Sequence, residues 1–173
     1  MLNIAQIDGL PAELCAVTPV TWAPEARAEE LLLMSGAVIR HGGAQAYYQP
    51  GTDEIHLPPR QWFPTGGRYY ATALHETCHW TAHPSRCNRQ LGKRFGSSEY
   101  AIEELIAEIG SAFLCAHCRI DGQLEHAASY VESWLKVLRS DARAVFVAAT
   151  KAQQAADHVL KLAQPPDLQA MAA

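Results

Sequence analysis

Two histidines and a glutamate stand in the pattern H-E-x-x-H within the stretch "HETCHW" at residues 75–80. On a helix, residues four positions apart lie on one face, so His75 and His79 can direct ring nitrogens at a single ion. Glu76 lies beside the first histidine and can accept a proton from a water at that ion without binding the ion itself. This arrangement is typical of zinc-dependent hydrolysis, and it predicts Glu76 as the catalytic residue.

A hydrolytic zinc site uses three protein ligands and keeps its fourth position open, so a third ligand is expected elsewhere in the chain. The stretch "EELIAE" at residues 103–108 offers one, because Glu104 and Glu108 share a helix face by their spacing of four. We expect Glu104 to bind the ion and Glu108 to accept a hydrogen bond from a ligand histidine. Glu103 lies about 100° further around the helix. We expect it to be a solvated carboxylate or, in the alternative, the third ligand itself.

A hydrolysis reaction also needs a hydrogen-bond donor for the oxyanion that develops on the substrate. Tyr100 lies one helical turn before Glu104 and is therefore a candidate for this role. The other candidates are His83, Arg86 and His126.

The helices that must hold these residues are indicated by the spacing of apolar residues and by capping and breaking residues. The helix that carries "HETCHW" has no proline or glycine, and it ends where His83 precedes Pro84. Ser97 or Ser98 can cap the next helix, and Asp141 can cap the last. The expected helices cover 24–34, 68–82, 99–115 and two further segments within 124–163 that meet near residues 140–141.

Short runs of strand-forming residues precede the "HETCHW" helix and are separated by turn residues. We expect three short strands in a meander, near residues 38–39, 46–48 and 54–57, with turns at 42–43 and 50–53. The expected fold class is therefore α+β. A small sheet containing antiparallel strands packs on the active-site helix, and a mostly helical C-terminal half follows.

The length of 173 residues and the hydrophobic content of 49% are sufficient for one domain with a core of its own. We expect an extended arm at residues 1–23, the folded domain at 24–163 and a flexible tail at 164–173. Five cysteines are an odd number in a chain of this size, which favours reduced thiols over a disulfide framework.

The formal net charge of −4 gives the chain no overall basic field, so direct nucleic-acid binding is not expected. The basic stretch "RCNRQLGKR" at 86–94 contains no aromatic residue for stacking on single strands. No apolar run approaches the roughly 20 residues of a membrane helix, and the first residues lack the features of a secretory signal. The expected location is the cytoplasm.

Four stretches of the sequence carry a resemblance to a known family: "GGAQAYYQPGTDEIHLPP", "YYATALHETCHWTAHPSR", "SEYAIEELIAEIGSAFLCA" and "YVESWLKVL". The chain resembles the zincin-like metallopeptidase domain of ArdC-type antirestriction proteins and TraC-type primases. It is more distantly similar to the IrrE and ImmA regulatory peptidases, which share the H-E-x-x-H helix and a later glutamate. The resemblance implies a zincin fold, in which a small sheet lies beside the active-site helix and the helix with the glutamate ligand follows.

ArdC-type proteins also carry an N-terminal domain that binds single-stranded DNA, and nothing in this sequence corresponds to it. We therefore expect a Zn²⁺-dependent peptidase that acts on a protein or peptide substrate. The sequence leaves open whether it works alone or beside a separately encoded DNA-binding partner. The alternative is a zinc-stabilised module that binds protein or nucleic acid and cleaves little. The intact Glu76 favours the enzyme, since a purely structural site has no use for a general base.

Overall fold

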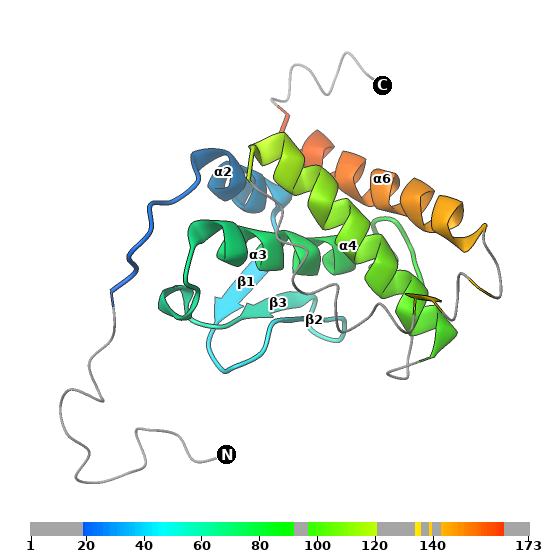
Figure 1. Cartoon of the computed structure of the whole chain (residues 1–173), viewed down its shortest axis with the longest axis horizontal. Coiled ribbons are helices and arrows are strands. Elements are labelled where there is room, and N and C mark those ends of the chain that lie inside the picture. The colour runs from blue at the N-terminus through cyan, green and yellow to red at the C-terminus, as the bar shows by residue number, and fades with distance from the viewer. Residues whose placement is uncertain (1–18, 92–96, 121–133, 136–138, 140–142, 165–173) are drawn as a thin grey trace, which may run out of the picture.

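The computed structural model describes residues 19–91, 97–120, 134–135, 139 and 143–164 (Figure 1). The three strands follow one another in the chain and form one sheet, with one α-helix before them and three α-helices after them; this α+β arrangement among the described residues confirms the predicted fold class. No helix within these ranges is long and apolar enough to cross a membrane. The elements are α2 (Ala26–Ser35), β1 (Val38–His41), β2 (Tyr47–Gln49), β3 (Glu54–Leu57), the 3-10 helix η2 (Arg60–Trp62), α3 (Gly66–Trp80), α4 (Ser98–Cys118) and α6 (Ala144–Leu162).

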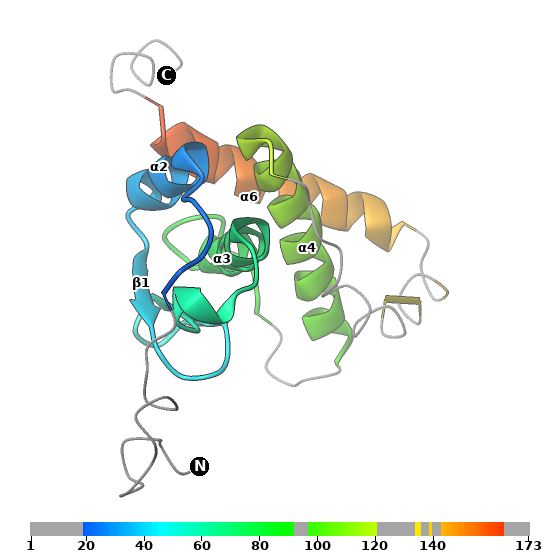
Figure 2. The same cartoon turned by 60° about the vertical axis from the view of Figure 1, so that its left-hand side comes forward.

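Helix α3 is the central element of the fold and carries the H-E-x-x-H motif. The sheet lies on one side of α3 and helices α4 and α6 lie on the other, as two views show (Figures 1 and 2). Because neighbours cover it on all sides, α3 is buried around most of its circumference, including Tyr69, Leu74 and Thr77. It begins at Thr65, whose side chain accepts a hydrogen bond from the backbone N–H of Arg68 at 3.2 Å.

The sheet is mixed and has the order β1-β3-β2, so the predicted meander is wrong. Strand β3 pairs with β1 in parallel and with β2 antiparallel. The glycine pair at residues 42–43 does not close a hairpin. Instead Gly42 donates its N–H to Leu57 O at 2.8 Å, and Gly43, with φ of +71°, redirects the chain. The only hairpin among the described strands therefore follows at residues 50–53, and β2 is left with one unpaired edge.

The predicted N-terminal arm and C-terminal tail lie mostly outside the described residues. The part of the arm that is described packs on the domain through Trp22. Its ring stacks on Tyr69 at 5.4 Å between centroids, and its Nε1–H donates to Phe63 O at 3.0 Å. The first of the two predicted C-terminal helices, the candidate His126 and the predicted cap Asp141 also fall outside these ranges.

Helices α3 and α4 pack closely because α4 has a glycine at their contact. A Cβ atom added to Gly110 would lie only 2.8 Å from Sγ of Cys78, whose side chain is fully buried. Next to this contact, the hydroxyl of Ser111 donates to Ala71 O at 3.3 Å. The close approach brings the acidic residues of α4 within reach of the histidines of α3.

Substitution of Gly110 by alanine is expected to destabilise the domain. Overpacking costs about 1–3 kcal/mol, and the gain in helix propensity returns about 1 kcal/mol, so we expect a net loss of up to about 2 kcal/mol in the free energy of unfolding. Denaturant unfolding measures this loss. In a Cys78→Ala background the sulfur is gone, and there Gly110→Ala should be neutral or stabilising. An equal loss in both backgrounds would contradict this account of the contact.

Candidate metal centre

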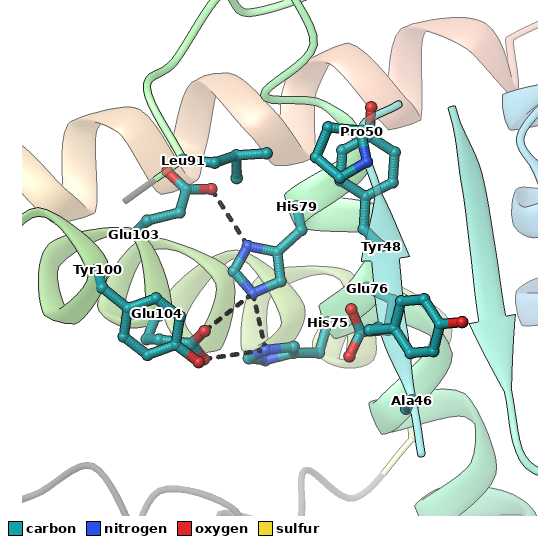
Figure 3. A pocket seen from close by; sticks show the side chains of 11 residues that line it. Ala46, Tyr48, Pro50, His75, Glu76, His79, Leu91, Tyr100, Glu103 and Glu104 are labelled. Atoms are coloured by element: carbon teal, nitrogen blue, oxygen red, sulfur yellow. Dashed lines mark hydrogen bonds and ion pairs between the residues drawn. The ribbon is translucent and has the colours of Figure 1, made fainter. Parts of the chain in front are cut away.

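Three side chains from α3 and α4 converge on one point (Figure 3). Nε2 of His75 and Nε2 of His79 are 3.1 Å apart. Glu104 faces both nitrogens, with its carboxylate oxygens at 3.5 Å from His75 and 3.6 Å from His79. One donor atom from each residue lies within 4.8 Å of the other two. Two imidazoles and one carboxylate with a shared focus form a divalent metal site, since neutral imidazole and carboxylate oxygen are donors that zinc and related ions accept.

The outward nitrogen of each histidine faces a second glutamate of α4. Nδ1 of His75 lies 3.6 Å from Oε1 of Glu108, and Nδ1 of His79 lies 3.3 Å from Oε1 of Glu103. The Glu108 oxygen is buried and has no hydrogen-bond partner among the described residues. Because His75 pairs with the later glutamate and His79 with the earlier one, the two helices run antiparallel across the site. Each histidine thus presents Nε2 to the centre and Nδ1 to its own carboxylate.

Glu103 is not the solvated carboxylate that the sequence suggested, because only 4% of its surface is exposed. Arg89 donates from Nε to Oε2 of Glu103 at 3.0 Å and from Nη2 to Oε1 at 2.8 Å. The alternative expectation, Glu103 as third ligand, also differs from the structure, since Glu103 faces Nδ1 of His79 and not the nitrogens that converge. Sequence spacing shows the angle between neighbouring residues but not which of them will be buried against an inward-pointing arginine.

Opposite charges shift the ionisation of the site strongly. Burial disfavours the charged form of Glu104, but hydrogen bonds from His75 and His79 outweigh it and hold the pKa of Glu104 well below its usual range. Burial likewise disfavours the imidazolium of His79, but bonds to Glu103 and Glu104 raise its pKa to about 10. The neighbouring carboxylates thus favour the protonated form of the His79 ring.

Glu76 lies beside this cluster without joining it. Its carboxylate points toward β2, where it accepts a hydrogen bond from the backbone N–H of Tyr48 (Figure 3). The residue is only 7% exposed, and burial raises the pKa of its carboxyl group. It lines two cavities, one of about 310 Å³ and one of about 430 Å³.

Both cavities follow the unpaired edge of β2. Ala46, Tyr47, His75 and Glu76 line both of them. The first cavity also contains Tyr100 beside Glu104, so the structure brings this oxyanion candidate to the site.

Two other oxyanion candidates have different contacts. His83 hydrogen-bonds through Nδ1 to the hydroxyl of Ser85 at 2.8 Å. Arg86 forms an ion pair with Asp53, and its guanidinium lies 3.8 Å from the centroid of the Trp80 ring. Neither residue lines the cavities beside Glu76. With Arg86 and Arg89 both turned inward, two cations of the basic stretch are already neutralised by carboxylates of the domain.

A central H-E-x-x-H helix beside a small sheet, followed by a helix that brings a glutamate to the two histidines, defines a zincin-type metallopeptidase domain. The family model described as zincin-like metallopeptidase matches residues 26–151, and the chain belongs to this family.

Two relatives align with nearly the whole chain. The chain is 47% identical over 165 residues to the DNA primase TraC of Escherichia coli. The aligned residues make up 95% of this chain and 15% of TraC. Protein y4eC of Sinorhizobium fredii is 44% identical, with 91% of the chain and 51% of that protein covered. The chain thus spans well under two thirds of the length of these relatives.

Two crystal structures of the antirestriction protein ArdC from plasmid R388 share the fold. The metal-free structure matches with a TM-score of 0.73 and 42% identity, over 94% of this chain and 59% of that one. The Mn(II)-bound structure matches with a TM-score of 0.76 and 41% identity, over 95% and 61%. The likeness to TraC and ArdC confirms the resemblance drawn from the sequence.

Metal binding is expected to strengthen as the pH rises. Since the pKa of His79 is raised to about 10, this ring carries a proton at neutral pH, and an ion must displace it. The affinity should therefore fall by up to about tenfold for each pH unit below that value, with release of about one proton per ion. Calorimetric zinc titrations at about pH 6 and about pH 8, in buffers of different ionisation enthalpy, measure both quantities. Equal affinity at the two pH values would contradict the expectation.

Proposed function

We propose that the chain is a zinc-dependent peptidase in which His75, His79 and Glu104 hold the ion and Glu76 is the general base. The observation that carries the proposal is the position of Glu76. Its buried carboxylate lies next to the convergent donors, stays out of the cluster, and lines two cavities. A structural metal site is closed by its ligands and has no need of such a group.

Zinc, when bound, would act as a Lewis acid and lower the pKa of its bound water toward about 7. Glu76 accepts the proton of the attacking water and then delivers it to the amine that leaves. The raised pKa of Glu76 suits both steps, because a general base works best when its pKa approaches the working pH. The backbone N–H of Tyr48 holds the carboxylate in place during this exchange.

Two further residues of α4 have proposed roles beside the ligands. Glu108, whose buried Oε1 lies 3.6 Å from Nδ1 of His75, would accept a hydrogen bond from that nitrogen in the metal-bound protein and so orient the ring. Tyr100 donates its hydroxyl to the oxyanion of the substrate, since it lines the same cavity as Glu76 and Glu104.

The proposed substrate is a protein segment in extended conformation. Strand β2 has one unpaired edge because β3 occupies the other, and Tyr47 of β2 and the preceding Ala46 line both cavities. A peptide can pair with that edge as an added strand and pass over Glu76. Since ArdC is an antirestriction protein, we place the substrate among host defence proteins.

Glu76→Gln is expected to abolish cleavage while the metal stays bound. The amide cannot accept the proton, and loss of a general base lowers the rate by about 10²–10⁴-fold. Digestion of a peptide library, analysed by mass spectrometry, measures cleavage, and metal analysis of the same sample measures occupancy. Full activity in this variant would exclude Glu76 as the base. No cleavage by the wild-type protein, with metal bound, would favour a binding module.

Glu104→Gln is expected to lose the metal. Replacement of the anionic ligand by a neutral amide of the same shape removes its charge from a site where both histidines depend on it. Metal content and the melting temperature, compared with and without zinc, measure the loss. Glu99→Gln is the matched control, because Glu99 is exposed in the first turn of the same helix. Equal zinc content in the two variants would contradict the ligand set.

A further inference from the structure

Arg89 is a buried cation that the proposed reaction does not use. Its side chain is 4% exposed, although it comes from the loop that follows α3. Besides its two bonds to Glu103, it donates from Nη1 to Oγ1 of Thr81 and from Nη2 to Cys78 O, both at 2.8 Å. A guanidinium is rarely buried without such partners, because loss of its hydration is costly. All the partners lie within a few residues of the metal ligands in sequence.

The loop is folded so that this side chain must turn inward. The backbone N–H of Cys87 donates to Thr81 O, and the N–H of Arg89 donates to Ala82 O, both at 2.9 Å. Between them Asn88 adopts the left-handed conformation with φ of +48°. These bonds return the chain to the C-terminal end of α3, where the cation also binds a helix carbonyl and complements the helix dipole.

Arg89 acts on the metal site through Glu103. Arg89 engages both carboxylate oxygens, and Oε1 is the oxygen that also faces Nδ1 of His79. An ionised carboxylate can only accept, so it selects the form of His79 that carries hydrogen on Nδ1. That form leaves the lone pair of Nε2 directed at the centre. Glu103, with both oxygens engaged, is also held away from the ion, although it is the direct neighbour of Glu104.

We propose that Arg89 is a positioning residue of the metal site, which fixes the His79 ring through Glu103 and keeps Glu103 out of the coordination sphere. The inference rests on the metal site of the proposed function. Arg89 itself contacts none of the proposed metal ligands, and it lies in the basic stretch of the sequence.

Arg86 provides a matched control in the same loop. It is also largely buried, donates from Nε to Trp80 O at 2.7 Å, and pairs with a carboxylate, that of Asp53. Its contacts therefore resemble those of Arg89 in size and chemistry but do not reach a ligand histidine. A purely structural role for Arg89 predicts similar results for both arginines, whereas the positioning role predicts a difference in metal affinity.

The test compares Arg89→Met, Arg86→Met, Glu103→Gln and the double variant Arg89→Met/Glu103→Gln. Zinc affinity is measured by competition with a chelator, and folding by thermal denaturation. We expect Arg89→Met to weaken zinc binding by about 10–100-fold, because the loss of a hydrogen-bond partner behind a ligand usually has an effect of this size. We expect Arg86→Met to bind zinc with an affinity within about twofold of the wild type. In the Glu103→Gln background the Arg89 substitution should change affinity by less than about threefold, because its effect passes through Glu103.

If Arg89→Met alone fails to fold, the double variant keeps the test decisive. It also removes the charge of Glu103, which Arg89→Met alone leaves buried and unpaired. Arg89→Lys then replaces the single variant, and a point charge that cannot make both bonds should restore zinc affinity only in part. Nitrogen-15 spectra of the zinc-loaded protein add a direct readout. The Nδ1–H signal of His79 should be present in the wild type and lost or broadened in the Arg89 variants.

Two results would overturn the inference. In the first, the wild type binds zinc and Arg89→Met binds it with equal affinity. If Arg89→Met does not fold, Arg89→Lys takes its place in this comparison. This result would remove the role of Arg89 and leave the proposed function intact. A wild-type protein that binds no zinc or manganese would overturn both. An Arg89 effect of full size in the Glu103→Gln background would show that the arginine does not act through Glu103.

Discussion

The structure depends on the pairing of opposite charges between α3 and α4. His75 and His79 on one helix meet Glu103, Glu104 and Glu108 on the other inside an otherwise apolar interface. Charged groups in such a place are costly unless each finds a partner. The antiparallel course of the helices supplies the partners, since the order of glutamates along α4 matches the reversed order of histidines along α3.

The remaining elements can be understood as supports for this pairing. Gly110 permits the close approach of the two helices, and Ser97 begins α4 by accepting a hydrogen bond from the N–H of Tyr100 at 3.2 Å. On the other side of α3, the hairpin of β2 and β3 brings the backbone of Tyr48 to Glu76. The carboxylate of Glu76 therefore belongs to the helix by sequence but is oriented by the sheet.

Crystal structures of ArdC match the fold of this chain both without metal and with Mn(II) bound. In the present structure hydrogen bonds between histidines and glutamates hold the donors together, and a proton on His79 compensates part of the negative charge. Such a preformed site exchanges a proton for an ion and needs little rearrangement of the chain.

The sequence by itself determined the helices, the H-E-x-x-H spacing and the choice of α4 as the source of an acidic partner, because these depend on the local period of 3.6 residues. Tertiary structure alone decided the sheet order, since a glycine pair does not reveal whether it closes a hairpin or carries the chain past a strand. It also decided the roles of Glu103 and Arg89. Burial and pairing of these two side chains depend on how a loop folds back on a helix end, a contact between segments that local spacing does not encode.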